Sequence, residues 1–218
     1  MTGTRLACWT LLIGSVSALN YAAYGSDTKA TGEEIYSWSS FADGIVFYGL
    51  ILGLVVLIAI HRWDLFALRR PRAAARAAGI AIAVIVSIVV WEFVVTILPF
   101  EDPGKEQGLT PKHWEAAHAS AFAANVVLFC VVAPIVEELT FRGVGQSLLR
   151  ERFGAVPAIL LVGVAFGAWH GLLIALLILI PLGSALAYLR ERTDSVLPGM
   201  VVHALFNAAA IAAAVSSV

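Results

Sequence analysis

The chain has 218 residues, of which 60% are hydrophobic and 13% are charged. Soluble domains are about 45–50% apolar and about 25% charged, so this composition excludes an ordinary soluble protein and indicates an integral membrane protein. The net charge of -1 provides no overall field that would recruit nucleic acid. Cys8 and Cys130 both lie inside apolar runs, so we expect two buried thiols and no disulfide framework.

Apolar runs in chain order predict an all-α fold, a polytopic membrane helical bundle that forms a single domain over residues 1–218. A helix needs about 20 residues to cross the hydrocarbon core. The run Ala155–Tyr188 is too long for one span, and we expect it to divide near His170-Gly171. About seven transmembrane helices follow, the others being Leu6–Tyr24, Gly44–Ile60, Gly79–Pro99, Ala119–Val136 and Val196–Val215.

The basic residues predict how the bundle is oriented. The loop 61–78 contains five arginines, and placing it in the cytoplasm puts all eleven arginines inside and the three lysines, Lys29, Lys105 and Lys112, outside. The N-terminus is then cytoplasmic and the C-terminus outside. An alternative is a signal peptide cleaved near Val16-Ser17-Ala18, which would leave six spans with the same orientation.

The stretch VEELTFRG, residues 136–143, places three charged residues at the end of an apolar run. Glu138 and Arg142 are four residues apart, so they share a helix face and can form an ion pair. Glu137 is rotated by about 100° from Glu138 and is left without that partner. Pro134 removes a backbone hydrogen bond and favours a bend just before these residues. The ion pair alone could also be a simple anchor at the inner face of the membrane.

Two further polar groups lie in later apolar spans: His170 in FGAWH, four residues after Phe166, and His203 in HALFN, four residues before Asn207. A carboxylate held away from bulk water can act as a general base toward water. Histidine can hold the same water, and a His–Asn pair can donate hydrogen bonds to an oxyanion. The same glutamate and two histidines could instead bind zinc, and their spacing does not distinguish the two readings.

Together, EELTFR, FGAWH and HALFN fit the patterns EExxxR, FxxxH and HxxxN. Three such motifs in this order resemble the type II CAAX prenyl endopeptidases, also called the Abi or CPBP intramembrane proteases. The resemblance covers a core of residues 131–208. It includes the approach to the third motif, where the family's usual Thr-Gly-Ser stands as Thr193-Asp194-Ser195.

The resemblance implies an intramembrane endopeptidase with its active site in a membrane-embedded cavity. Glu137 would activate water, His170 would orient that water, and His203 and Asn207 would stabilise the oxyanion. Glu138, Arg142 and Phe166 would be supporting residues. No cofactor is firmly implied; a divalent metal such as zinc, if used, would be held by Glu137, His170 and His203.

The implied partners are the lipid bilayer and a membrane-bound protein or peptide, with no nucleic acid. The arginine-only inner face favours a bacterial plasma membrane, where a prenylated substrate is not expected. Two alternatives stay open: a non-catalytic immunity or partner protein of the same family, and a transporter that uses intramembrane Glu and His residues. Glu92, in VVWEFVV, is a further intramembrane carboxylate with no assigned role.

One depth problem accompanies these assignments. If Glu137 lies near the inner face, a straight helix from Ala155 would carry His170 about 22 Å away from that face. The two could then meet only if the fifth span starts later or tilts. An amphipathic interfacial segment over residues 144–153 is one way to arrange this.

Overall fold

The computed structural model describes residues 2–24, 32–98 and 114–216. Every regular element in these ranges is helical, which confirms the predicted all-α membrane bundle. Two short 3-10 turns, η1 (Glu33–Tyr36) and η2 (Trp63–Phe66), accompany the longer helices. The separate long helices are α1 (Thr2–Tyr24), α2 (Trp38–Ile58), α3 (Ala74–Thr96), α8 (Ala155–Trp169), α9 (Leu176–Thr193) and α10 (Leu197–Ser216).

Between α3 and α8, residues 116–153 form one continuous helical stretch. It consists of η3 (Ala116–His118), α5 (Ala119–Val127), the π-helical turn η4 (Leu128–Val132), α6 (Ala133–Glu138), the π-helical segment η5 (Leu139–Gly145) and α7 (Gln146–Phe153). The predicted end of this span at Val136 was therefore wrong, as was a separate interfacial segment over 144–153. The apolar run ends at Val136, but neighbouring helices bury the polar residues that follow, so the helix continues through them.

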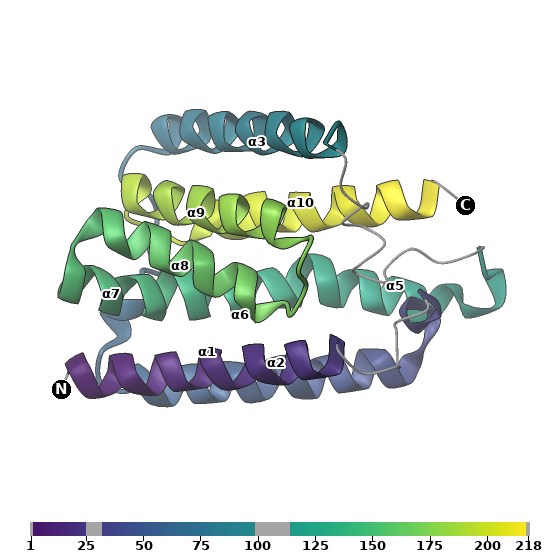
Figure 1. Cartoon of the computed structure of the whole chain (residues 1–218), viewed down its shortest axis with the longest axis horizontal. Coiled ribbons are helices and arrows are strands. Elements are labelled where there is room, and N and C mark those ends of the chain that lie inside the picture. Colours follow the sequence, from purple (N-terminus) through teal and green to yellow (C-terminus); the bar gives the residue numbers. More distant parts are fainter. Residues whose placement is uncertain (1, 25–31, 99–113, 217–218) are drawn as a thin grey trace.

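The long helices lie roughly parallel to the long axis of the molecule (Figure 1). In this view α1 and α2 lie along one side and α3 along the opposite side, with α5 to α10 between them. The start of α1 and the end of α10 lie at opposite ends of the bundle. One buried apolar cluster includes residues of α1, α2, α3 and α6 to α10, so the first half of the chain shares a core with the motif-bearing half.

The predicted division of the long apolar run is confirmed, because α8 ends at Trp169 and α9 begins at Leu176. Gly171 follows with a φ of 66°, the left-handed conformation that commonly ends helices. From α1, the Asn20 side chain donates a hydrogen bond to the Trp169 carbonyl, with an N–O distance of 2.6 Å. The first helix therefore supports the turn that holds His170.

The length of the 116–153 helix resolves the depth problem. Gly154, with a φ of 86°, separates α7 from α8. Counted from this turn, Glu137 lies 16 residues before Phe153 and His170 lies 15 residues after Ala155. At 1.5 Å per residue both are about 22–24 Å from the turn. The two side chains can therefore lie at similar depth without a tilted or shortened helix.

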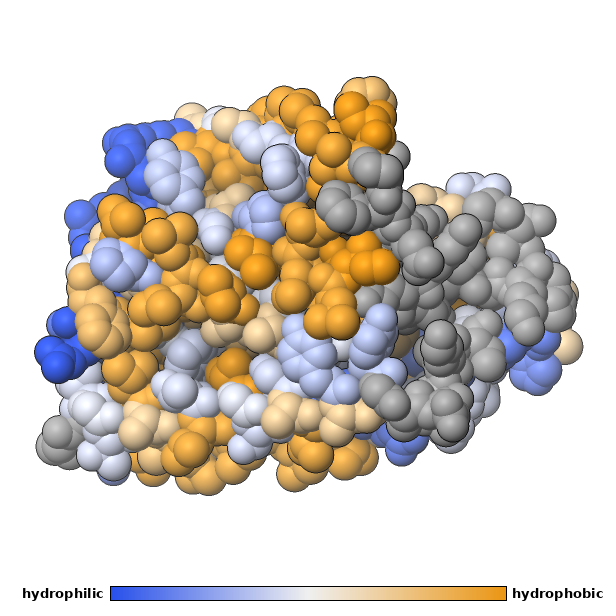
Figure 2. Space-filling model, viewed as in Figure 1, coloured by the Kyte–Doolittle hydropathy of each residue, from blue (hydrophilic) through white to orange (hydrophobic). Residues whose placement is uncertain are grey.

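Apolar side chains cover much of the outer surface between the two ends of the bundle, and charged residues gather at the end where α1 begins (Figure 2). Among the described residues, five helical stretches are long and apolar enough to cross a membrane: α1, α2, α3, residues 116–153 and α10. The apolar helix α8 is shorter, so the count of about seven spans stays a prediction. Lys29, Lys105 and Lys112, which the orientation argument used, lie outside the described residues.

Candidate active site

The predicted ion pair between Glu138 and Arg142 is present and completely buried. The Arg142 Nη1 atom lies 2.7 Å from Glu138 Oε1, and both side chains are 0% exposed. Arg142 also donates from Nη2 to the Gly183 carbonyl of α9 at 3.0 Å, and its guanidinium carbon lies 4.3 Å from the centre of the Phe166 ring. This pair therefore ties the 116–153 helix to α8 and α9 inside the bundle.

His203 of α10 lies between the two adjacent glutamates. Its Nδ1 atom is 3.1 Å from Glu138 Oε1, and its Nε2 atom is 3.7 Å from Glu137 Oε2. An ionised carboxylate can only accept hydrogen bonds, so Nδ1 is the donor to Glu138. Glu138 thus balances Arg142 and fixes the ring of His203, which leaves Nε2 directed toward Glu137.

Glu137 is buried and has a hydrogen-bond partner on α2. The Tyr48 hydroxyl donates to Glu137 Oε1 at 2.9 Å. With Tyr48 on one carboxylate oxygen and His203 near the other, the orientation of this carboxylate is set by two other helices. The sequence analysis did not single out Tyr48. It could have been found as a tyrosine within an apolar span, because a buried tyrosine hydroxyl needs a hydrogen-bond partner.

His170 lies at the end of α8, and its Nδ1 atom is 2.8 Å from the Phe166 carbonyl one turn earlier. A carbonyl oxygen only accepts, so Nδ1 carries the proton and Nε2 keeps a free lone pair. The Phe166 ring centre lies 4.9 Å from that of His170 and 5.5 Å from that of His203. Phe166 therefore packs between the two histidines.

The side chain of Asn207 contacts a backbone carbonyl of the helix that carries the first motif. In the π-helical turn η4 each carbonyl accepts from the residue five positions on, as when Ala133 donates to the Leu128 carbonyl. The corresponding donor for the Phe129 carbonyl would be Pro134, which has no N–H group. Asn207 replaces it, donating from Nδ2 to the Phe129 carbonyl at 2.8 Å. The second N–H of the Asn207 amide is left for another acceptor.

Close approach of α10 to α6 depends on Gly199. A Cβ atom at this position would lie 2.7 Å from Glu138 Oε2. Without a side chain at 199, α10 can bring His203 against both glutamates. That oxygen of Glu138 is buried and has no hydrogen-bond partner among the described residues.

The structure joins the predicted residues other than Asn207 through direct contacts, Asn207 lies one turn from His203 on α10, and Glu92 is not part of this group. Glu92 is half-buried on α3, and no hydrogen bond or ion pair within the described ranges joins it to Glu137. Its neighbour Trp91 donates to the Leu177 carbonyl of α9 at 2.6 Å. Glu92, to which the sequence assigned no role, therefore lies apart from the candidate site.

The geometry does not favour the predicted metal ligands Glu137, His170 and His203. In the part of the chain that the structure describes, no group of three or more His, Cys, Asp or Glu side chains is arranged to hold a metal ion. The Nδ1 atoms of both histidines already face protein acceptors. Metal-binding histidines usually donate their other ring N–H to such acceptors, so the metal-ligand assignment stays a prediction.

Fold and site together define a polytopic membrane protein with two buried glutamates, a buried histidine (His203) and a partly buried one (His170), drawn from three helices. Residues 119–209 match the family described as "Type II CAAX prenyl endopeptidase Rce1-like". The match confirms the resemblance found in the three motifs, and it includes every predicted site residue. No curated protein and no solved structure shows significant similarity to the chain.

Proposed function

We propose that this protein is an intramembrane endopeptidase that hydrolyses a peptide bond of a membrane-associated protein or peptide. The observation that carries the proposal is the different environment of the two adjacent glutamates. Glu138 is neutralised by Arg142, whereas the contacts of Glu137 among the described residues are with Tyr48 and His203. A buried carboxylate without a cationic guanidinium partner is available to accept a proton. The match of residues 119–209 to a protease family supports the same conclusion.

In the proposed mechanism Glu137 and His170 hold the attacking water. Glu137 Oε2 and the free Nε2 of His170 each accept a hydrogen bond, which directs a lone pair of the water oxygen at the scissile carbonyl carbon. Glu137 takes one proton as the carbon–oxygen bond forms. The same carboxyl group then gives that proton to the leaving amine when the carbon–nitrogen bond breaks. Such acid–base catalysis typically contributes about 10²–10⁴-fold in rate.

His203 and Asn207 are assigned to the developing oxyanion. This role requires a proton on both ring nitrogens of His203 while the oxyanion exists. His203 then donates from Nδ1 to Glu138 and from Nε2 to the oxyanion. Asn207 donates through the N–H that does not bind Phe129. Losing one such donor typically costs about 10²–10³-fold in rate.

The test compares protein termini in membranes of cells that carry the wild type, Glu137→Gln or Glu92→Gln at matched expression. Glu92→Gln makes the same chemical change to an intramembrane carboxylate outside the proposed site. We expect a set of termini that the wild type and Glu92→Gln produce and Glu137→Gln does not.

Identical termini with the wild type and Glu137→Gln would overturn the proposal. If Glu137→Gln also kept the biological function of the wild type, the protein would be a non-catalytic partner. Loss of function in both variants with unchanged termini would point to ion or proton transport.

A further inference from the structure

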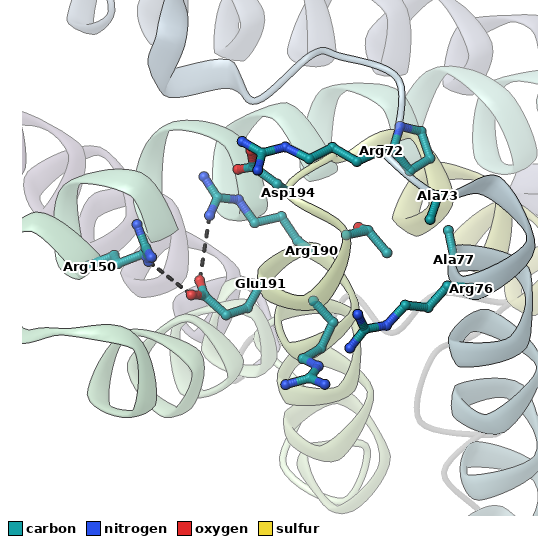
Figure 3. A pocket seen from close by; sticks show the side chains of 11 residues that line it. Arg72, Ala73, Arg76, Ala77, Arg150, Arg190, Glu191 and Asp194 are labelled. Atoms are coloured by element: carbon teal, nitrogen blue, oxygen red, sulfur yellow. Dashed lines mark hydrogen bonds and ion pairs between the residues drawn. The ribbon is translucent and has the colours of Figure 1, made fainter.

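A second polar feature of the molecule lies outside the proposed active site, at the arginine-rich end of the bundle. A pocket of about 510 Å³ opens there between the start of α3, the end of α7 and the end of α9 (Figure 3). Pockets of about 300–1,000 Å³ are typical of small-ligand sites. The residues that line it are Pro71, Arg72, Ala73, Arg76, Ala77, Arg150, Arg190, Glu191, Arg192, Thr193 and Asp194.

The lining has an excess of positive charge, with five arginines and two acidic residues. Glu191 is shared by Arg150 at 2.9 Å and Arg190 at 3.6 Å, which flank it in Figure 3. Asp194 lies 3.7 Å from Arg72. The other two arginines of the pocket, Arg76 and Arg192, have no acidic partner among residues 2–24, 32–98 and 114–216.

Arg190 points to an anionic ligand in this pocket. The residue is only 5% exposed, and its Nη2 atom donates to Ser147 Oγ at 2.7 Å. Its Nε atom is buried and has no hydrogen-bond partner among the described residues. Native proteins rarely leave a buried polar group unpaired. Its carboxylate neighbour Glu191 is shared with Arg150, so an additional anion would complete the charge balance.

The backbone at the start of α3 adds further donors beside these side chains. This helix begins at Ala74, and no side chain caps its first N–H groups. Ala73 and Ala77, on either side of that first turn, both line the pocket. Uncapped N–H groups and the helix dipole favour an anion at this position. Arginine side chains provide the forked donors that suit phosphate oxygens.

The position of the pocket identifies the source of the anion as lipid. Beyond its first turn, the outer face of α3 exposes apolar side chains. They include Ile82, Val86 and Phe93. A headgroup bound at this end of the bundle would leave its acyl chains to the apolar sides of the helices (Figure 2). Basic pockets between membrane helices bind anionic headgroups in this way.

We propose that this pocket binds the phosphate-containing headgroup of an anionic phospholipid. Arg76, Arg192 and Arg190 supply the charge that the acidic residues leave uncompensated. The proposal is independent of the proteolytic activity, because none of these residues belongs to the cluster around Glu137.

Native mass spectrometry of the purified full-length protein in detergent would test the proposal. The probes are dioleoylphosphatidylglycerol and dioleoylphosphatidylcholine, which share acyl chains and differ in net headgroup charge. We expect the wild type to bind the anionic lipid roughly tenfold more tightly or better, and Arg76→Gln/Arg192→Gln to lose most of this preference, because a hydrogen bond to a charged group contributes about 1.5–3 kcal/mol. Both arginines are exposed and unpaired, so the double variant should fold normally.

Arg70→Gln/Arg152→Gln is the matched control. It removes the same charge from exposed residues outside the pocket lining, and we expect its affinity to stay within about twofold of the wild type. An equal loss in both double variants would overturn the pocket in favour of diffuse surface charge. Equal affinity for the two lipids would also overturn it. Equally tight binding of free glycerol phosphate would replace the lipid with a soluble phosphate ester.

Discussion

At the scale of single residues, the two adjacent glutamates have different partners: Arg142 pairs with Glu138, and Tyr48 donates to Glu137. The four-residue spacing correctly predicted that Glu138 pairs with Arg142, because partners on one helix face are fixed by helix geometry alone. The contact between His203 and Glu138 could not be predicted in this way. It depends on how closely α10 approaches α6, which is decided by tertiary packing and by Gly199.

Glu138→Gln is expected to lower stability much more than Glu137→Gln. The first change leaves the fully buried Arg142 guanidinium without its counter-charge, and breaking a buried ion pair typically costs about 3–5 kcal/mol. The second keeps an oxygen that can accept from Tyr48. Thermal unfolding of the two purified variants in the same detergent measures the difference. Equal unfolding temperatures would contradict the structural role assigned to Glu138.

Tyr48→Phe is expected to reduce proteolysis while leaving the protein folded. A hydrogen bond to a charged group contributes about 1.5–3 kcal/mol, so the rate should fall by roughly tenfold to a hundredfold if the bond orients Glu137 for catalysis. Cleavage of a substrate identified from the termini comparison is the measurement. Tyr188→Phe, on an exposed residue of α9, is the control. An unchanged rate in Tyr48→Phe would remove Tyr48 from the positioning of the base.

At the scale of elements, hydropathy predicted where helices exist better than where they end. The predicted run stopped at Val136 because it was defined by apolar side chains, whereas the helix continues to Phe153. Pro134 correctly marked an irregularity. The backbone consequence, a π-helical turn whose Phe129 carbonyl is taken up by Asn207, requires knowledge of the partner helix. The end of α8 at His170-Gly171 was predictable because glycine commonly ends helices.

Gly199→Ala is expected to destabilise the packing of α10 on α6. The added Cβ would lie 2.7 Å from Glu138 Oε2, and Glu138 is held in place by Arg142. Overpacking of this kind typically costs about 1–3 kcal/mol. Gly53→Ala in α2 is the matched control, because no heavy atom lies within 4 Å of its Cβ position. Thermal unfolding should fall for the first variant and stay level or rise for the second.

At the scale of the whole molecule, the first half of the chain is structurally joined to the half that carries the motifs. Trp9 of α1 donates from Nε1 to the Thr140 carbonyl at 2.9 Å, and Asn20 supports the turn beside His170. Tyr48 of α2 reaches Glu137. The sequence resemblance began only at residue 131, since generic apolar spans carry no motif. The contacts that α1 and α2 make with the site could therefore not be predicted from the sequence.

The predicted orientation places the N-terminus in the cytoplasm and the C-terminus outside. It follows from the rule that arginine-rich loops and ends stay on the cytoplasmic side. A fluorescent protein that matures only in the cytoplasm should therefore be bright when fused before Met1 and dark when fused after Val218. A phosphatase that is active only outside should give the reverse result. A bright C-terminal fusion would contradict the predicted topology.

Among the described residues the basic side chains other than histidine are all arginines, because the three lysines lie outside the described ranges. The guanidinium group cannot be deprotonated in proteins. The positive end of the bundle is therefore a permanent charge, unlike one built from histidine, which would change with the acidity of the cytoplasm. A change in pH near neutrality leaves these arginine charges unaltered, so the predicted orientation should not depend on it.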